Sequence, residues 1–110
     1  MSADSAPVTI FDEVVLPAGS VDAWLDRWRA EYVPGALRRG LVLRGVWRGH
    51  TEDAEQSVVV IQWSLATIEA FFASRGQAGA DPSVTSFWEA TDQLAISRNR
   101  RVLEDAGVAL

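Results

Sequence analysis

The sequence predicts a single α+β domain in which one β-sheet packs against one layer of helices. Hydrophobic periodicity and turn residues give the order strand, helix, strand, strand, helix, strand, with the second helical region in two pieces. Two β-α-β halves of this kind form a ferredoxin-like sheet with helices on one face. The strands carry apolar residues in both alternating phases, so the other face also needs a cover. We therefore expect a homodimer that forms through this open face.

The first strand and helix are indicated by residue type and spacing. Residues 8–16 are rich in β-branched side chains, and the segment ends at Pro17, which is typical of a strand. Ser20 is a suitable N-cap, and apolar residues then recur at helical spacing over residues 21–32. We expect Pro34 and the glycine after it to end or kink this helix.

The middle of the chain predicts a β-hairpin. Residues 41–51 and 57–65 are strand-like and are separated by a short polar connection. Residues 58–61 are continuously apolar, which is typical of a central strand. Gly45 and Gly49 are candidate positions for a bulge or a bend in the first strand of the hairpin.

The second helical region is predicted in two pieces. Residues 67–75 form the first helix, and residues 76–80 are expected to be a loop. Asp81 followed by Pro82 is typical of an N-cap and a first helical residue, so a second short helix begins there. Residues 93–104 are then the last strand candidate.

The length suits one domain, which we place at residues 8–104, between a flexible N-terminus (1–7) and a C-terminal tail (105–110). Without cysteine, the chain has no disulfide, no thiolate zinc site and no cysteine nucleophile. A single histidine excludes a multi-histidine metal site within one chain, and no glycine-rich phosphate loop is present. We therefore expect neither a metal nor a cofactor.

Charge and hydropathy limit the kinds of partner that the chain can bind. The net charge of -5 argues against nucleic acid and against anionic membranes. No apolar run approaches the length of a membrane-spanning helix, and no secretory signal precedes the first strand. These features predict a cytoplasmic protein whose partners are a small-molecule ligand and a second copy of itself.

The strand over residues 58–64 (VVVIQWS), followed by the helical segment 68–74 (IEAFFAS), carries a family resemblance. The chain resembles the dimeric α+β barrel superfamily, and it is most similar to the antibiotic biosynthesis monooxygenase family and its small relatives. The resemblance implies a ligand cavity between sheet and helices. It also implies one of three reactions: isomerisation, dehydration, or the cofactor-free oxygenation of an aromatic polyketide in secondary metabolism.

The haem-degrading branch of that superfamily is a poor match. Its members use an asparagine on the first strand, a tryptophan on the third and a histidine on the second helix. Trp63 matches the tryptophan, but Asp12 stands near the asparagine position, and no histidine lies in residues 67–91. The resemblance therefore does not extend to a haem ligand.

Five tryptophans are candidates for a flat, aromatic-lined pocket. Trp63 and Trp47 share a strand phase that we expect to face the helices. Trp24, Trp28 and Trp88 could supply the opposite wall, with Phe72 and Arg44 as further substrate-binding residues. The alternative for each tryptophan is an ordinary place in the hydrophobic core.

Three titratable residues are candidate acid–base groups, in the order Asp12, His50, Glu13. Asp12 and Glu13 are adjacent on a strand, so they point to opposite faces and one of them should lie inside. A desolvated carboxylate can act as a general acid or base near neutral pH. The alternative for Asp12 is an ion pair, with Arg44 as the expected partner.

The basic run over residues 98–101 could hold a ligand carboxylate or phosphate. It could instead keep an edge strand from pairing with another chain, or form ion pairs with acids of a partner subunit.

These observations favour a small cofactor-free enzyme that acts on an aromatic or polycyclic metabolite, either monooxygenase-like or as an isomerase or dehydratase. The alternative is a non-catalytic ligand-binding or accessory protein of the same fold. The two differ in whether an ionisable group lies in the cavity.

Overall fold

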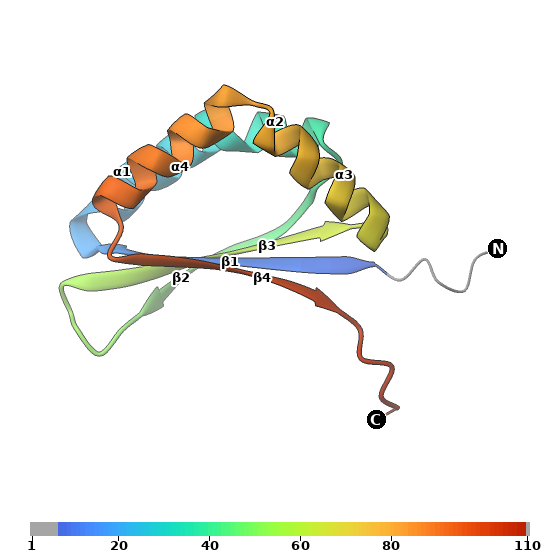
Figure 1. The fold of residues 1–110 in the computed structure, drawn as a ribbon. Helices are drawn as coiled ribbons and strands as arrows, with labels where there is room; N and C mark the ends of the chain where they lie inside the picture. Colours follow the sequence, from blue (N-terminus) through green and yellow to red (C-terminus); the bar gives the residue numbers. More distant parts are fainter. Residues whose placement is uncertain (1–6, 110) are drawn as a thin grey trace.

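The computed structural model describes residues 7–109 and contains a four-stranded antiparallel sheet covered by helices on one face (Figure 1). The strands are β1 (Val8–Pro17), β2 (Val42–His50), β3 (Gln56–Leu65) and β4 (Ser97–Glu104), in the spatial order β2-β3-β1-β4. This order is the ferredoxin-like arrangement, so the predicted fold class is confirmed. Of the segment expected to be flexible, residues 1–6 lie outside the described residues.

The first helical region continues through the proline that was expected to end or kink it. A short 3-10 turn, η1 (Ala18–Ser20), leads into α1 (Val21–Arg27), a π-helical turn, η2 (Trp28–Tyr32), and α2 (Val33–Arg38). Pro34 lies in the first turn of α2, where its missing N–H is tolerated, and the preceding backbone widens into the π turn. Gly40 then adopts a φ of +94°, a left-handed conformation that suits glycine and ends the helix.

The second helical region contains less loop and more helix than the sequence predicts. Helix α3 (Ile68–Gly79) runs through most of the expected loop, so that prediction was wrong. Asp81 caps α4 (Pro82–Leu94) as expected, and its Oδ1 accepts a hydrogen bond from the backbone N–H of Ser83 at 2.9 Å. Helix α4 is also longer than predicted. Thr91 in its last turns is buried, and its hydroxyl accepts a hydrogen bond from the Trp24 indole N–H at 3.0 Å. The final strand therefore begins at Ser97 and not at residue 93.

A bulge in β2 reverses which side chains point to the helices in the second half of that strand. Leu43 lies opposite Trp63 of β3, but Gly45 lies opposite the next residue, Gln62, so Arg44 is an extra residue. Beyond the bulge, Trp47 therefore lies on the open face of the sheet, where it is 50% exposed. The expectation that Trp47 faces the helices was wrong. Its ring covers Gly45, where no room remains for a Cβ.

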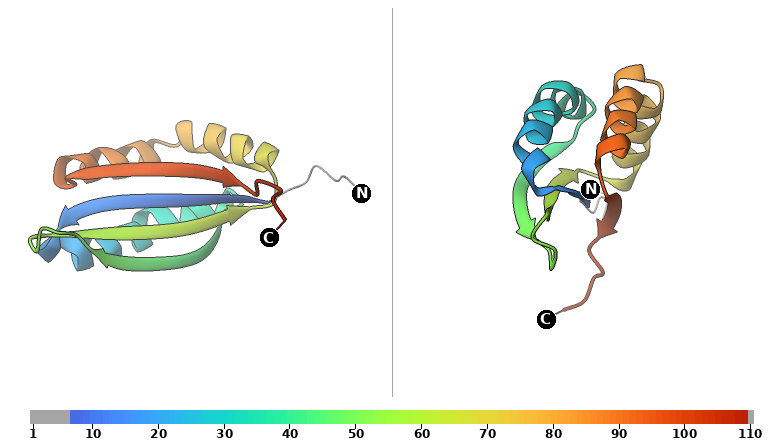
Figure 2. Two further views of the ribbon diagram at one scale, coloured as in Figure 1. Left: turned by 90° about the horizontal axis from the view of Figure 1, so that it is seen from below. Right: turned by 90° about the vertical axis from the view of Figure 1, so that its left-hand side faces the viewer.

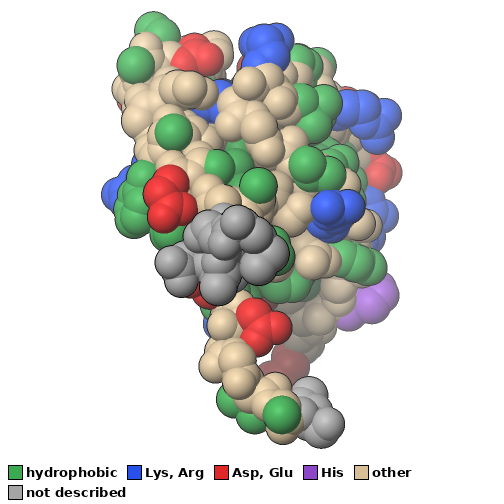
Figure 3. Space-filling view, turned by 90° about the vertical axis from the view of Figure 1, so that its right-hand side faces the viewer, with side chains coloured by type: hydrophobic (Ala, Val, Ile, Leu, Met, Phe, Trp, Pro, Cys, Tyr) green, Lys and Arg blue, Asp and Glu red, His purple; other side chains and the backbone are tan. Residues whose placement is uncertain are grey.

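The two faces of the sheet differ in burial. Alternate residues of β1 and β3 point to the helices and are buried, and the others point to a face that no helix covers (Figure 2). The larger apolar side chains on this open face are Phe11, Val15, Val42, Trp47, Val58, Val60 and Leu103. Other apolar side chains also reach the surface, and Figure 3 shows several beside arginines at one end of the molecule.

The core between sheet and helices is largely aromatic. The Trp24 and Trp28 rings stack at 6.4 Å between centroids, and Trp28 lies 5.9 Å from Trp63. Phe87 of α4 packs against both Trp24 and Tyr32. This cluster holds the two helical regions on the sheet. None of the helices in the described part of the chain is long and apolar enough to cross a membrane.

Candidate functional site

A cavity of about 470 Å³ lies on the helix side of the sheet, over the β1–β4 edge. Its walls come from both strands, from η2 and from the α3–α4 pair. Its polar and aromatic lining includes Asp12 of β1, Tyr32 of η2, Arg75 of α3, Trp88 of α4, and Arg98 and Arg100 of β4. The other polar lining residues are Glu13, Thr85, Glu89, Asp92 and Asn99. Small residues of α3, Ala78 and Gly79, leave the space open beneath that helix.

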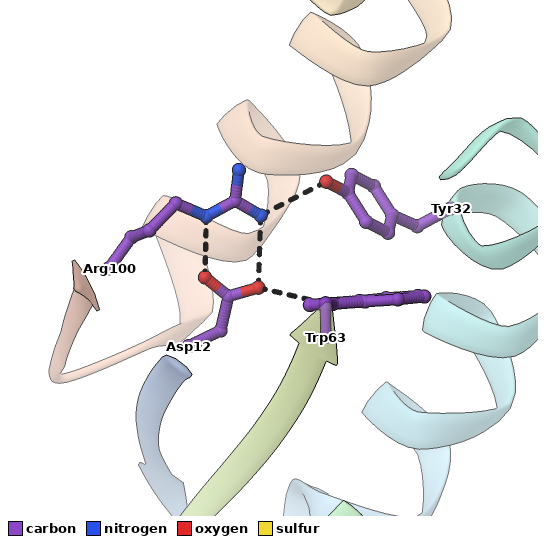
Figure 4. A network of polar contacts seen from close by, with 4 residues as sticks. All are labelled: Asp12, Tyr32, Trp63 and Arg100. Carbon is purple, nitrogen blue, oxygen red and sulfur yellow. Dashed lines mark hydrogen bonds and ion pairs between the residues drawn. The ribbon is translucent and has the colours of Figure 1, made fainter. Parts of the chain in front are cut away.

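A partly buried ion pair forms the base of the cavity. Asp12 and Arg100 lie directly opposite each other on β1 and β4, and both point to the helices. The guanidinium donates two hydrogen bonds to the carboxylate, from Nε to Oδ1 at 2.6 Å and from Nη2 to Oδ2 at 2.9 Å (Figure 4). The Asp12 side chain is 4% exposed and that of Arg100 is 36% exposed. This bidentate pair is fixed by the strand register.

Two aromatic side chains complete this network. The indole N–H of Trp63 donates to Oδ2 of Asp12 at 3.3 Å, and Nη2 of Arg100 also donates to the Tyr32 hydroxyl at 3.1 Å. Both Asp12 oxygens are therefore occupied by donors. The Tyr32 hydroxyl accepts from a cation and retains its own proton for donation.

The surroundings of Arg100 keep it cationic. Burial alone lowers the pKa of its guanidinium, but hydrogen bonds and charge from Asp12 raise it, with a further rise from Tyr32. Together the raising effects win, so the pKa of Arg100 lies above its ordinary value.

The expected partner of Asp12 was wrong. Arg44 lies on β2, two strands away, and its Nε donates to the Ser64 hydroxyl at 2.8 Å. Because β1 lies between β3 and β4, the cross-strand neighbours of Asp12 are Ile61 and Arg100. The ion-pair interpretation of Asp12 thus holds with a different arginine.

A second aspartate–arginine pair lies at the rim of the cavity. Arg98 of β4 donates to both carboxylate oxygens of Asp92 on α4, and its guanidinium also lies 4.8 Å from the centroid of the Trp88 ring. The hydrogen bond from Arg98 lowers the pKa of Asp92. The Asp92 side chain is 51% exposed, so this pair is open to solvent.

The structure distributes the other candidate residues over several places. Trp88 lines the cavity, while Trp24, Trp28 and Trp63 are buried in the core behind it. Phe72 points outward from α3 and is 58% exposed. His50 is exposed at the end of β2, the strand at the opposite edge of the sheet from β4. Strand alternation directs the Glu13 side chain to the open face, although this residue borders the cavity.

The sequence prediction gave Tyr32 no functional role, and it did not single out Arg100 within the basic run. Tyr32 was only the last member of the apolar helical stripe, yet a tyrosine there can place a hydroxyl above the sheet. Arg100 was one member of a basic run, and only strand alternation distinguishes it from Arg101. Among residues 7–109, no group of three or more acidic or histidine side chains could hold a metal ion.

The fold and the cavity define a class of protein: ferredoxin-like α+β domains with a cavity between sheet and helices. No protein-family model and no curated protein matches the sequence. Solved structures do match. A NIPSNAP family protein from Agrobacterium tumefaciens is similar with a TM-score of 0.72 at 18% identity, over 99% of this chain and 94% of that one. An uncharacterised NIPSNAP domain protein from Burkholderia xenovorans is similar with a TM-score of 0.72 at 19% identity, over 94% and 98%.

A protein from Nitrosomonas europaea, named as a candidate antibiotic biosynthesis monooxygenase, is similar with a TM-score of 0.62. The match has 7% identity and covers 97% of both chains. These structures share the ferredoxin-like arrangement of strands and helices, so the fold that the resemblance implied is confirmed. At such identities the likeness establishes the fold alone.

Proposed function

We propose that the chain binds a small organic molecule with a flat apolar part in the cavity over the β1–β4 edge. The observation that carries this proposal is the cavity itself. Its volume of about 470 Å³ lies within the range of roughly 300–1,000 Å³ that is usual for small-molecule sites. Three of its polar groups, Asp12, Arg100 and Tyr32, are held in one orientation by hydrogen bonds to one another, which suits a specific site.

An aromatic or polycyclic ligand is favoured by the wall that Trp88 provides. The centroid of its ring lies 5.3 Å from that of Tyr32, in an edge-to-face arrangement, and the Arg98 guanidinium lies over the ring at 4.8 Å from the centroid. These contacts hold the indole in one orientation at the cavity surface. A flat ligand ring can then stack against it at low entropic cost.

A second candidate function is cofactor-independent catalysis on the same ligand, monooxygenase-like or by proton transfer as in an isomerase or dehydratase. The Tyr32 hydroxyl favours it, because it accepts a hydrogen bond from Arg100 and keeps its own proton for donation toward the cavity. In this proposal Asp12 is a positioning residue, since Arg100 and Trp63 occupy both of its oxygens. His50 and Glu13 have no part in it.

Calorimetric titration with a neutral flat probe, 2-naphthamide, tests the binding proposal. We expect the Trp88→Ala variant to bind the probe about tenfold more weakly than the unmodified chain, because the stacking wall is lost. Phe72→Ala is the matched control, since Phe72 is an exposed aromatic residue of α3 outside the cavity. Circular dichroism confirms that each variant is folded. Equal affinities for both variants would contradict the proposal.

We further propose that a second copy of the chain covers the open face of the sheet. Phe11, Val60 and Trp47 give this face apolar surface, and it also carries Glu13 and Arg101, whose charges a two-fold axis could bring together. Light scattering on a sizing column should then give twice the mass of one chain. Trp47→Arg should convert the dimer to a monomer, and Phe72→Arg, the same kind of change on the helix layer, should not. A monomer in the unmodified chain would refute the dimer.

A further inference from the structure

A small recess adjoins the cavity beneath the helices. Its volume is about 50 Å³, and it shares Tyr32, Arg75, Ala78 and Arg100 with the larger space. The remaining lining residues come from β1, from α3 and from the segment after α2: Ile10, Phe71, Ser74, Arg39 and Leu41. A space of this size accommodates a group of only a few heavy atoms.

The charges that line the recess are all positive. Arg39, Arg75 and Arg100 come from three separate parts of the fold, and no carboxylate is among the lining residues. The chain as a whole carries a net charge of -5, so this concentration of cations runs against its overall charge. Like charges brought together in a partly desolvated site repel one another, and an anion between them would relieve that repulsion.

Arg39 supplies a donor that lacks an acceptor. Its Nε is buried and has no hydrogen-bond partner among the described residues. The guanidinium lies 5.6 Å from the centroid of the Tyr32 ring, and this contact holds it in place. A buried donor without an acceptor is costly, so such a group points to a partner that the protein itself does not provide.

The other two arginines also keep donors for a ligand. Arg75 takes part in none of the ion pairs found among residues 7–109. Arg100 uses Nε and Nη2 on Asp12 and Tyr32, and Figure 4 shows its third nitrogen turned away from the Asp12 carboxylate. Asp12 balances the charge of Arg100, and Asp81 lies near enough to Arg39 for their charges to interact, which leaves Arg75 without an ion-pair partner among residues 7–109.

We propose that this recess binds a carboxylate group, so that the ligand is an aromatic or other flat carboxylic acid with its apolar part in the adjoining cavity. The inference rests on the proposed function and specifies the chemical class of its ligand. A carboxylate is planar, accepts hydrogen bonds on both oxygens and matches the planar fork of a guanidinium. It is also small enough for the recess.

The test compares two probes of the same shape, 2-naphthoate and the neutral 2-naphthamide, by calorimetric titration at fixed ionic strength. The unmodified chain should bind the carboxylate about ten- to a hundredfold more tightly than the amide. This preference should fall to near unity in Arg75→Gln and in Arg39→Gln. It should persist in Arg29→Gln, which removes the same charge from an exposed position of the helix layer outside both spaces.

The outcomes separate the two proposals. If both probes bind equally well to the unmodified chain, the carboxylate inference is overturned and the binding function stands. The inference is also overturned if Arg29→Gln reduces the preference as much as Arg75→Gln. Binding of neither probe overturns both proposals. If Arg39→Gln does not fold, the Arg75→Gln variant alone decides the carboxylate inference, because Arg75 is exposed on α3 and its replacement should leave the fold intact.

Discussion

Two aspartate–arginine pairs flank the cavity, and they have the same chemistry in different surroundings. Arg100 and Arg98 are two residues apart on β4, and both point to the helices. Arg100 binds an aspartate whose side chain is 4% exposed, and Arg98 binds one that is 51% exposed. The inner pair also receives a hydrogen bond from Trp63 and donates one to Tyr32. Burial and these extra bonds decide how much each pair matters.

The difference assigns the two pairs different tasks. The inner pair joins β1 and β4 and fixes the guanidinium beneath the cavity, so it acts as a rigid base. The outer pair connects the end of α4 to β4 through long, hydrated side chains, and such pairs contribute little to stability. It can open without loss of the fold and so leaves the rim of the cavity adaptable.

Asp12→Asn should cause the largest effect of the three changes that test this comparison. The variant leaves the Arg100 cation without its counter-charge in a mostly buried position. We expect a loss of about 3 kcal/mol in the free energy of unfolding, at the low end for a broken buried pair, because part of Arg100 stays hydrated. Urea-induced unfolding measures this loss.

The double variant Asp12→Asn with Arg100→Met is the control for that experiment. It removes the stranded charge, and we expect it to recover part of the lost stability. A single Asp12→Asn variant as stable as the unmodified chain would contradict the assignment of the inner pair as the base of the cavity.

Tyr32→Phe should have an intermediate effect. It removes the hydroxyl that accepts from Arg100 and keeps the ring that packs on Trp88 and Trp63. We expect a loss of about 1 kcal/mol, the usual net value of one hydrogen bond, measured by the same unfolding experiment. A loss as large as that of Asp12→Asn would mean that Tyr32, and not Asp12, holds Arg100 in place.

Asp92→Asn should have the smallest effect on the free energy of unfolding, and the size of that effect should depend on pH. Because Arg98 lowers the pKa of Asp92 in the folded chain, the pair stabilises the fold above the carboxyl pKa of the unfolded chain. That contribution disappears as the pH falls through the lower, folded pKa. Thermal unfolding curves should therefore differ slightly at neutral pH and converge in acid. A difference that grows toward acid pH would contradict this account.

The sequence predicted the order of the elements and the ferredoxin-like class, because these depend on local periodicity. It also predicted that one of Asp12 and Glu13 lies inside, and the structure places Asp12 there. It did not predict the facing of Trp47, since one extra residue at Arg44 reverses a strand phase and alternation alone does not reveal it. The loop expected before Asp81 was mostly helix, because a glycine in a helix costs only about 1 kcal/mol relative to alanine and does not forbid the helix.

The network around Asp12 was predicted only in part. The ion-pair alternative was correct in kind, but its partner depends on which strand lies next to β1, and that is a property of the whole sheet. The recess is harder still to predict. Arg39, Arg75 and Arg100 are far apart in sequence, and only the packing of α2, α3 and β4 brings them together.

A crystal structure of the protein with 2-naphthoate would test the central claim most directly, namely that the cavity over the β1–β4 edge is the ligand site. The account predicts that the naphthyl ring lies against Trp88 and that the carboxylate lies within hydrogen-bond distance of Arg39 or Arg75. A naphthyl ring bound on the open face of the sheet against Trp47, with the cavity unoccupied, would contradict it.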